Sequence, residues 1–150
     1  MAIERRGDNG CFVSSDPAKL DLGFIHGFLA TSYWARSISR EVVERSVAGS
    51  LCFGVYDAGR QVGFGRVITD RATFAYLADV FIAETHRGRG LAKLLMETIL
   101  SHPDLQGLRR IQLVTRDAHG LYEKFGFRAL ENPARHLEIV RARAYEKDPA

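Results

Sequence analysis

The four residues from Arg87 to Gly90 alternate arginine with glycine where one type of secondary structure gives way to another. Before them, Phe74 to Ala83 is a long apolar run typical of a strand. After them, apolar residues recur at the spacing of an amphipathic helix. Backbone N–H groups at the start of a helix are unpaired, and the helix dipole adds positive potential there. Together with the arginines, this pattern predicts a binding site for an anion such as a phosphate.

Two common phosphate-binding patterns fit this connection poorly. A P-loop requires G-x-x-x-x-G-K-[ST], but Lys93 lies beyond the second glycine and neither Ser nor Thr follows it. A Rossmann dinucleotide site requires G-x-G-x-x-G, and Lys93 stands where its third glycine belongs. The strand before the glycines also closes an antiparallel series, which a Rossmann unit does not contain. Both patterns are therefore weak explanations of the glycines.

A third pattern fits better and covers two segments. Residues 87–92, Arg-Gly-Arg-Gly-Leu-Ala, match the signature R/Q-x-x-G-x-G/A of the GNAT superfamily of N-acetyltransferases. Residues 121–127, Leu-Tyr-Glu-Lys-Phe-Gly-Phe, resemble the second hallmark of that superfamily, L-Y-x-x-x-G-F. The spacing between the two motifs and the order of elements from Leu20 to Val140 also agree with that fold. The chain therefore resembles a GNAT N-acetyltransferase.

The resemblance implies acetyl-CoA as co-substrate and no metal. In such proteins the backbone N–H groups of the glycine loop hold the pyrophosphate, and pantetheine bonds to the end of the preceding strand. The corresponding loop residues are Gly88, Gly90, Leu91, Ala92 and Lys93, with Arg87 and Arg89 alongside. The corresponding strand residues are Val80, Phe81 and Ile82. An anion nest beside an open strand edge suits a pyrophosphate that carries an amide-bearing arm.

Acetyl transfer to an amine requires a neutral amine, a donor for the oxyanion and stabilisation of the departing thiolate. Backbone N–H groups near Phe81 or Ile82 could serve the oxyanion. Tyr122 matches the position that the superfamily commonly uses to protonate the thiolate. Since the free pKa values are about 10 for tyrosine and about 8.5 for a thiol, a hydrogen bond to the sulfur is the safer expectation. The competing interpretation is that Tyr122 only fills the core.

The sequence does not single out a general base. Asp79 interrupts an otherwise apolar strand just before the expected pantetheine stretch, so its carboxylate must be paired, hydrogen-bonded or shifted in pKa. It is a candidate catalytic residue, although a structural partner for an arginine or a backbone amide is the stronger interpretation. His119, one turn before Tyr122, is a second candidate. Deprotonation through ordered water, without any single base, is the third.

The acceptor amine is expected to bind near the N-terminal helices. Tyr33, Trp34 and Arg36 form the most suggestive group, because aromatic rings can line a pocket for an apolar body or a cation. Arg36 would suit an acceptor that carries a carboxylate. Alternatively, Trp34 only packs its loop against the sheet. The sequence indicates a small-molecule or peptide amine without naming it.

The elements that position these residues form a single expected domain, residues 1–150, of mixed α/β type. We expect a GNAT-like, mostly antiparallel central sheet of about six to seven strands flanked by about four helices, with only one crossover connection. Residues 1–9 are expected to be a loose end. The expected helices are 20–30, 39–47 with Ser39 as N-cap, the helix after Gly90, and 119–124. The expected strands are 11–13, 51–56, 61–69, 74–83, 110–115, 127–130 and 136–140.

Composition limits the remaining possibilities. A formal net charge of +3 is too mild to predict nucleic-acid binding, and the arginines are scattered outside the glycine loop. No apolar run approaches the ~20 residues of a membrane span, and the N-terminus is too polar for a signal peptide, so we expect a cytoplasmic protein with no membrane partner. Cys52 lies in an apolar run, where a buried, reduced thiol is expected.

The leading hypothesis is an N-acetyltransferase, an acyltransferase that moves acetyl from acetyl-CoA to a primary amine by direct attack on the thioester. The alternative is a non-catalytic acyl-CoA-binding or interaction module on the same fold, since a fold does not determine activity. A homodimer is possible, as dimers are common among similar proteins.

Overall fold

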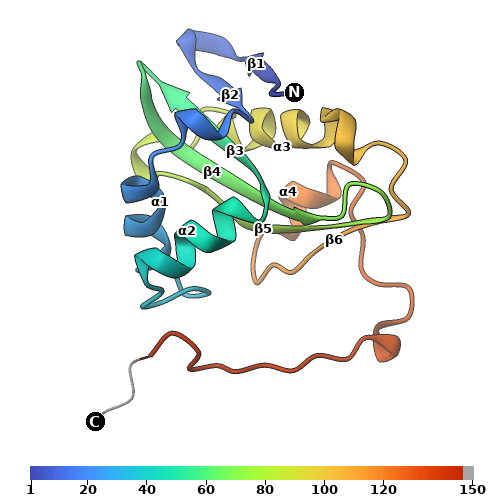
Figure 1. The fold of residues 1–150 in the computed structure, drawn as a ribbon. Helices are drawn as coiled ribbons and strands as arrows, with labels where there is room; N and C mark the ends of the chain where they lie inside the picture. Colours follow the sequence, from blue (N-terminus) through green and yellow to red (C-terminus); the bar gives the residue numbers. More distant parts are fainter. Residues whose placement is uncertain (147–150) are drawn as a thin grey trace.

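The computed structural model describes residues 1–146, and its centre is a six-stranded sheet (Figure 1). The strands lie in the sheet in their order along the chain. Their bounds are Glu4–Arg6 (β1), Phe12–Ser14 (β2), Leu51–Asp57 (β3), Arg60–Thr69 (β4), Phe74–Ile82 (β5) and Arg110–Leu113 (β6). The α-helices of this part of the chain are Leu22–Leu29 (α1), Arg40–Ala48 (α2), Leu91–Ser101 (α3) and His119–Glu123 (α4).

Strands β1 to β5 pair with their neighbours in antiparallel fashion, whereas β6 runs parallel to β5 because α3 connects the two. The β5–β6 pairing extends only from Phe74 opposite Arg110 to Leu77 opposite Leu113. Strand β5 continues to Ile82, so its second half extends beyond its pairing with β6. This sheet confirms the expected GNAT-like fold, mixed and mostly antiparallel.

The sheet is covered on both faces, and each face has its own core (Figure 1). On one face α3 packs against the sheet; this α3 core includes Phe53, Val67, Leu77, Ile82, Leu95, Met96 and Ile99. On the other face lie α1 and α2; this α1–α2 core includes Ile25, Leu29, Val43, Phe64 and Phe81. Phe53, Phe64, Leu95 and Met96 are fully buried, so both cores are well packed.

Side-chain caps determine where the two N-terminal helices begin. The Asp21 carboxylate accepts a hydrogen bond from the Phe24 backbone N–H at 3.0 Å, so α1 begins after Asp21. The Ser39 hydroxyl oxygen accepts from the Val42 N–H at 3.2 Å, which confirms Ser39 as the N-cap of α2. In the first turn of each helix, one backbone N–H group is therefore paired with a side-chain oxygen.

Three segments differ from the expectation. Residues 4–6 are not loose: they form β1, and the adjacent Ile3 N–H donates to the Ser15 hydroxyl at 2.8 Å. Residues 127–130 and 136–140, expected as the final strands, belong to no strand of the sheet. We call residues 131–146 the C-terminal arm. It leaves the body beside α4 and runs across the bottom of the view in Figure 1.

Candidate active site

A β-bulge in β5 is the central feature of the site. Ala78 lies opposite Arg66 of β4, but Phe81 lies opposite Phe64, so β5 contains one residue more than β4 over this stretch. Asp79 occupies the bulge with φ 52°, in the left-handed region that non-glycine residues rarely adopt. The bulge falls just after Leu77, where the pairing with β6 stops. Strand β5 is therefore kinked at the point where it loses its parallel neighbour.

The Asp79 side chain is held from two directions. Its Oδ2 accepts a hydrogen bond from Arg66 Nε at 2.7 Å, and its Oδ1 accepts from Trp34 Nε1 at 2.8 Å. The side chains of Arg66 and Asp79 are only 15% and 10% exposed, so this ion pair is largely shielded from water. Because both carboxylate oxygens are occupied, the geometry favours a structural partner over a general base. A catalytic role for Asp79 stays an untested prediction.

Beyond the bulge, the backbone of β5 presents polar groups on its side away from β4. The Ala83 N–H donates to the Val62 carbonyl of the β4 side at 2.7 Å. Backbone groups alternate direction along a strand, so those of Ile82 point to the opposite side, where β6 has ended. The Ile82 carbonyl accepts a hydrogen bond from Arg87 Nε at 3.1 Å. The predicted pantetheine stretch, 80–82, thus extends beyond the pairing with β6, although Phe81 is paired with Phe64 of β4 and Arg87 holds the Ile82 carbonyl.

A cavity of about 670 Å³ lies against β5 from Tyr76 to Val80. One wall is formed by the bulge and by Arg66 and Tyr76, and the loop between α1 and α2 supplies a second. The third wall is the connection from β6 to α4, residues 113–118, together with Tyr122. Tyr145 of the C-terminal arm also borders the cavity. We call this space the central cavity.

Tyr122 lies in α4 on the wall opposite the bulge. It is 9% exposed, and its ring meets that of Phe127 edge-on at a centroid distance of 5.9 Å. Burial, followed by the nearby Tyr33, raises the pKa of the Tyr122 phenol above its usual value. The phenol therefore stays protonated at neutral pH and can donate a hydrogen bond into the cavity. His119, the other candidate in α4, is exposed and does not border the central cavity.

The glycine loop has the backbone geometry that anion binding requires. Gly88 and Gly90 have φ values of 78° and 75°, which L-residues adopt only at a cost. Gly90 is the N-cap of α3, and no side chain within residues 1–146 caps that helix. The first N–H groups of α3, at Leu91, Ala92 and Lys93, therefore remain available to a ligand.

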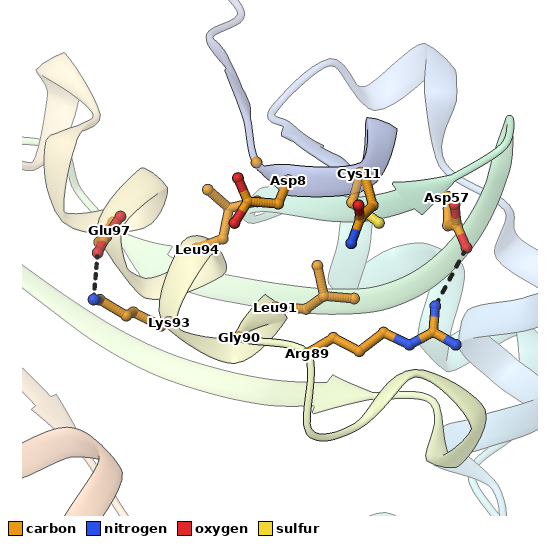
Figure 2. A pocket seen from close by; sticks show the side chains of 11 residues that line it. Asp8, Cys11, Asp57, Arg89, Gly90, Leu91, Lys93, Leu94 and Glu97 are labelled. Atoms are coloured by element: carbon orange, nitrogen blue, oxygen red, sulfur yellow. Dashed lines mark ion pairs between the residues drawn. The ribbon is translucent and has the colours of Figure 1, made fainter.

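The side chains of Arg89 and Lys93 form ion pairs with carboxylates of the same chain. Figure 2 shows Arg89 reaching Asp57, with Arg89 Nη1 at 3.9 Å from Asp57 Oδ2, and Lys93 reaching Glu97, also at 3.9 Å. Both border a second cavity of about 360 Å³ between α3 and the β1–β2 connection. All four side chains are at least a quarter exposed, so these ion pairs are weak. Arg89 and Lys93 are thus free to turn toward a stronger anion.

Two of the three residues predicted for the acceptor site meet at the central cavity. Tyr33 and Trp34 border it, with their rings edge-on at a centroid distance of 5.0 Å. Arg36 is exposed and does not border it. Arg116, which sequence reasoning missed, lies with its guanidinium 3.8 Å from the Tyr33 ring centroid. Tyr33 is thereby held between Trp34 and a cation.

Arg66 was also missed, although the sequence contains a usable signal. It interrupts the apolar strand 61–69 just as Asp79 interrupts the next strand. Opposite charges inside two consecutive hairpin strands indicate a cross-strand ion pair. The bulge, however, depends on the register between β4 and β5, which neither charge reveals alone.

The other reactive side chains of the described residues, 1–146, build no metal centre. Residues 1–146 contain no group of three or more His, Cys, Asp or Glu side chains placed to hold a metal ion. No helix in that range has the length and apolar character needed to cross a bilayer. Cys52 is a free, buried thiol, as expected, and burial raises its pKa to about 12. It is therefore an uncharged core residue.

Comparisons with known proteins identify the family of this chain. Residues 48–129, from the end of α2 to beyond α4, match the model of the acetyltransferase (GNAT) domain. A candidate acetyltransferase of Gibberella zeae is 32% identical over 142 aligned positions, which cover 79% of this chain and 78% of that protein. The chain belongs to the GNAT acetyltransferase family.

Solved structures place this GNAT protein among close and distant relatives. A GNAT-family candidate acetyltransferase from Xanthomonas campestris pv. campestris is 48% identical, with a TM-score of 0.91, over 94% of this chain and all of that one. An acetyltransferase-like protein of Clostridium acetobutylicum, solved with acetyl-CoA, is 14% identical with a TM-score of 0.62. It covers 93% of this chain and 96% of its own, and shares the fold alone.

Proposed function

We propose that this GNAT protein transfers an acetyl group from acetyl-CoA to a primary amine, and that residues 1–150 act as a single domain. One observation carries the proposal: the end of β5 beyond its pairing with β6 lies between the uncapped start of α3 and the phenol of Tyr122. The loop of the anion site directly follows the end of this strand, and Val80 of the strand borders the central cavity together with Tyr122. A thioester attached to a pyrophosphate has the matching order of groups.

The loop and the strand would bind different parts of acetyl-CoA. The N–H groups of Gly88, Gly90, Leu91, Ala92 and Lys93 would hold the pyrophosphate, with Arg87 and Arg89 alongside. The backbone of the stretch Val80, Phe81 and Ile82 would line the pantetheine, and the polar groups of Val80 and Ile82, which point away from β4, would pair with its amides as an added strand does. The Clostridium acetobutylicum protein, which shares the fold, was solved with acetyl-CoA, and this supports acetyl-CoA as the ligand.

The chemistry requires few side chains. The amine nitrogen attacks the thioester carbonyl carbon, the C–S bond breaks, and the amine loses one proton. An N–H near Phe81 or Ile82 would stabilise the oxyanion. Tyr122 would donate a hydrogen bond to the sulfur as negative charge develops there. Since its pKa is raised, Tyr122 acts as a donor rather than as an anion.

The acceptor would enter between the bulge and the aromatic pair of Tyr33 and Trp34. That wall suits a small-molecule or peptide amine with an apolar body near the nitrogen. Because both oxygens of Asp79 are engaged, removal of the amine proton through water fits the geometry better than removal by Asp79. Arg36 lies outside this wall, so we assign it no contact with the acceptor.

An acceptor screen tests the proposal directly. Acetyl-CoA should raise the melting temperature, and a panel of amines should include at least one that releases free CoA thiol in proportion to acetylated product. A melting-temperature increase without turnover on any small amine, peptide N-terminus or lysine would favour a non-catalytic acyl-CoA-binding module. No increase at all would refute the assignment of the loop.

A further inference from the structure

The chain between β5 and α3 has little packing of its own. We call residues 84–90 the β5–α3 connection; it contains the glycine loop. Of these seven residues, only His86 is not exposed. The cavity of about 360 Å³ borders the connection at Arg89 and Gly90, and the two glycines add backbone freedom. A contact with another element is therefore needed to hold the connection in one shape.

Within residues 1–146, the side-chain hydrogen bonds and ion pairs that leave this connection reach two places. Arg87 Nε donates to the Ile82 carbonyl, which lies only five positions back along the chain. The other two contacts end on one oxygen of Asp57, which lies 2.9 Å from His86 Nε2 and 3.9 Å from Arg89 Nη1 (Figure 2 shows the contact with Arg89). Asp57 belongs to β3, which β4 separates from β5 in the sheet. It is therefore the one residue that ties these side chains to a distant element.

The backbone of Asp57 is firmly placed. Asp57 is the last residue of β3 and pairs with Arg60, the first residue of β4. The two residues between them, Ala58 and Gly59, have φ values of 50° and 78°. Positive φ at both positions is typical of the tight two-residue turns that join hairpin strands. The carboxylate is thus presented from a short, regular hairpin.

The two contacts of Asp57 differ in strength. The side chains of His86 and Asp57 are 19% and 27% exposed, so their contact is partly shielded from water. A carboxylate only accepts, so His86 Nε2–H donates to it, while His86 Nδ1 lies 2.8 Å from the Thr85 hydroxyl oxygen. The Arg89 side chain is 55% exposed and its contact is long, so that ion pair is weak. His86 therefore anchors the connection, and Arg89 is held only loosely.

We propose that Asp57 is a positioning residue for acetyl-CoA: through His86 it holds the glycine loop in the shape that binds the pyrophosphate, without touching the cofactor. The inference rests on the proposed function, in which this loop binds acetyl-CoA. A loop already fixed in its binding shape loses less conformational freedom on binding, which raises affinity. The contact with Arg89 acts in the opposite direction, because Asp57 competes with the phosphates for that guanidinium. Since this contact is the weaker one, positioning through His86 dominates.

Two substitutions of Asp57 separate its hydrogen bond from its charge. Asp57→Ala loses both, whereas Asp57→Asn keeps an oxygen that can accept from His86 Nε2 and no longer attracts Arg89 by charge. By calorimetry with CoA, Asp57→Ala should raise Kd at least about tenfold, and Asp57→Asn should stay within about threefold of the native value. Asp104→Ala is the matched control: it removes an exposed ion pair with Arg71, outside the connection, and should leave Kd unaltered. Equal losses in Asp57→Ala and Asp57→Asn would overturn positioning through His86.

His86→Ala provides a second route to the same contact. It should weaken CoA binding as much as Asp57→Ala does, and the double variant should lose no more than either single one. Fully additive losses would contradict the proposal, because the two residues would then act independently.

Hydrogen exchange of the free protein distinguishes positioning from general destabilisation. In Asp57→Ala the amides of residues 86–90 should exchange faster, while those of β4 should keep their native rates. With an accepted amine, KM for acetyl-CoA should rise and kcat should not change. If the native protein bound no CoA, the proposed function would fail and this inference with it. CoA binding that Asp57→Ala leaves unchanged would overturn this inference alone.

Discussion

The indole N–H of Trp34 donates a hydrogen bond to Oδ1 of Asp79 at 2.8 Å, across 45 positions of sequence. This bond connects the loop between α1 and α2 to the bulge of β5. One end of it belongs to the proposed acceptor wall and the other to the proposed cofactor strand. In the proposed site, this contact would help to set the position of the amine relative to the thioester.

Replacing Trp34 with Phe keeps an aromatic ring but removes the donor. We expect KM for the amine to rise several-fold, while the dissociation constant of acetyl-CoA stays unchanged. Unfolding free energy should fall by about 1 kcal/mol, the typical net value of one hydrogen bond. Steady-state kinetics and calorimetry measure these effects. Arg40→Ala, on the exposed part of α2, is the control; equal effects from both variants would mean that the contact has no specific role.

Removal of Arg66 should be far more damaging than removal of an exposed arginine. Arg66→Met leaves the Asp79 carboxylate largely buried and without its cation, at a cost of about 3 kcal/mol in unfolding free energy. The double variant Arg66→Met/Asp79→Asn should regain much of that loss, because no unpaired charge remains while Asn tolerates the φ of 52° and still accepts from Trp34 Nε1. Urea denaturation of the two variants measures the difference. Additive losses would show that the residues do not act as a pair.

Tyr122→Phe tests the proposed proton donor. The change should lower kcat at least about tenfold and leave acetyl-CoA affinity unaltered, since the ring and its packing are retained. Because the pKa of the phenol is raised, activity of the native protein should not decline through Tyr122 ionisation below about pH 10. An unchanged kcat in the variant would remove Tyr122 from the mechanism.

Gly90→Ala should weaken acetyl-CoA binding by distorting the start of α3. Nothing lies within 4 Å of an added Cβ, but the φ of 75° costs a non-glycine residue about 1 kcal/mol or more. Gly27→Ala in α1 is the matched control: it also has open space, but no positive φ, so it should gain about 0.5–1 kcal/mol. Thermal shift with and without acetyl-CoA distinguishes the two. A similar gain for both would refute the strain argument.

Asp70 should make folding sensitive to acid. Its carboxylate accepts hydrogen bonds from the Thr73 hydroxyl and from backbone N–H groups, including those of Thr73 and Ala72, which lower its pKa. A lowered folded pKa contributes stability that is full above the unfolded value of about 3.9 and is lost as the pH falls below it. The stability difference between native protein and Asp70→Asn should therefore shrink below about pH 4. A constant difference would contradict this assignment.

The sequence predicted the parts of the site that are local in the chain. The glycine loop and Tyr122 were recognisable because each lies in a short motif that carries its own turn or helix. The bulge at Asp79 was not, because it arises from a register between strands that only the folded sheet determines. Its partners Arg66 and Trp34 come from two other elements. Residues 136–140 were expected in the sheet but lie outside it, because local composition does not reveal whether a segment finds a strand to pair with.

The bulge also reverses which residues of β5, odd-numbered or even-numbered, face each side of the sheet. Before it, odd-numbered residues, Ala75 and Leu77, belong to the α3 core; after it, even-numbered Ile82 does, while Phe81 joins the α1–α2 core. Deleting one residue at the bulge would shift the later residues of β5 by one position. Each of their side chains would then point to the opposite face of the sheet, and so to the other core. The extra residue is thus as necessary to the packing of both faces as to the cleft.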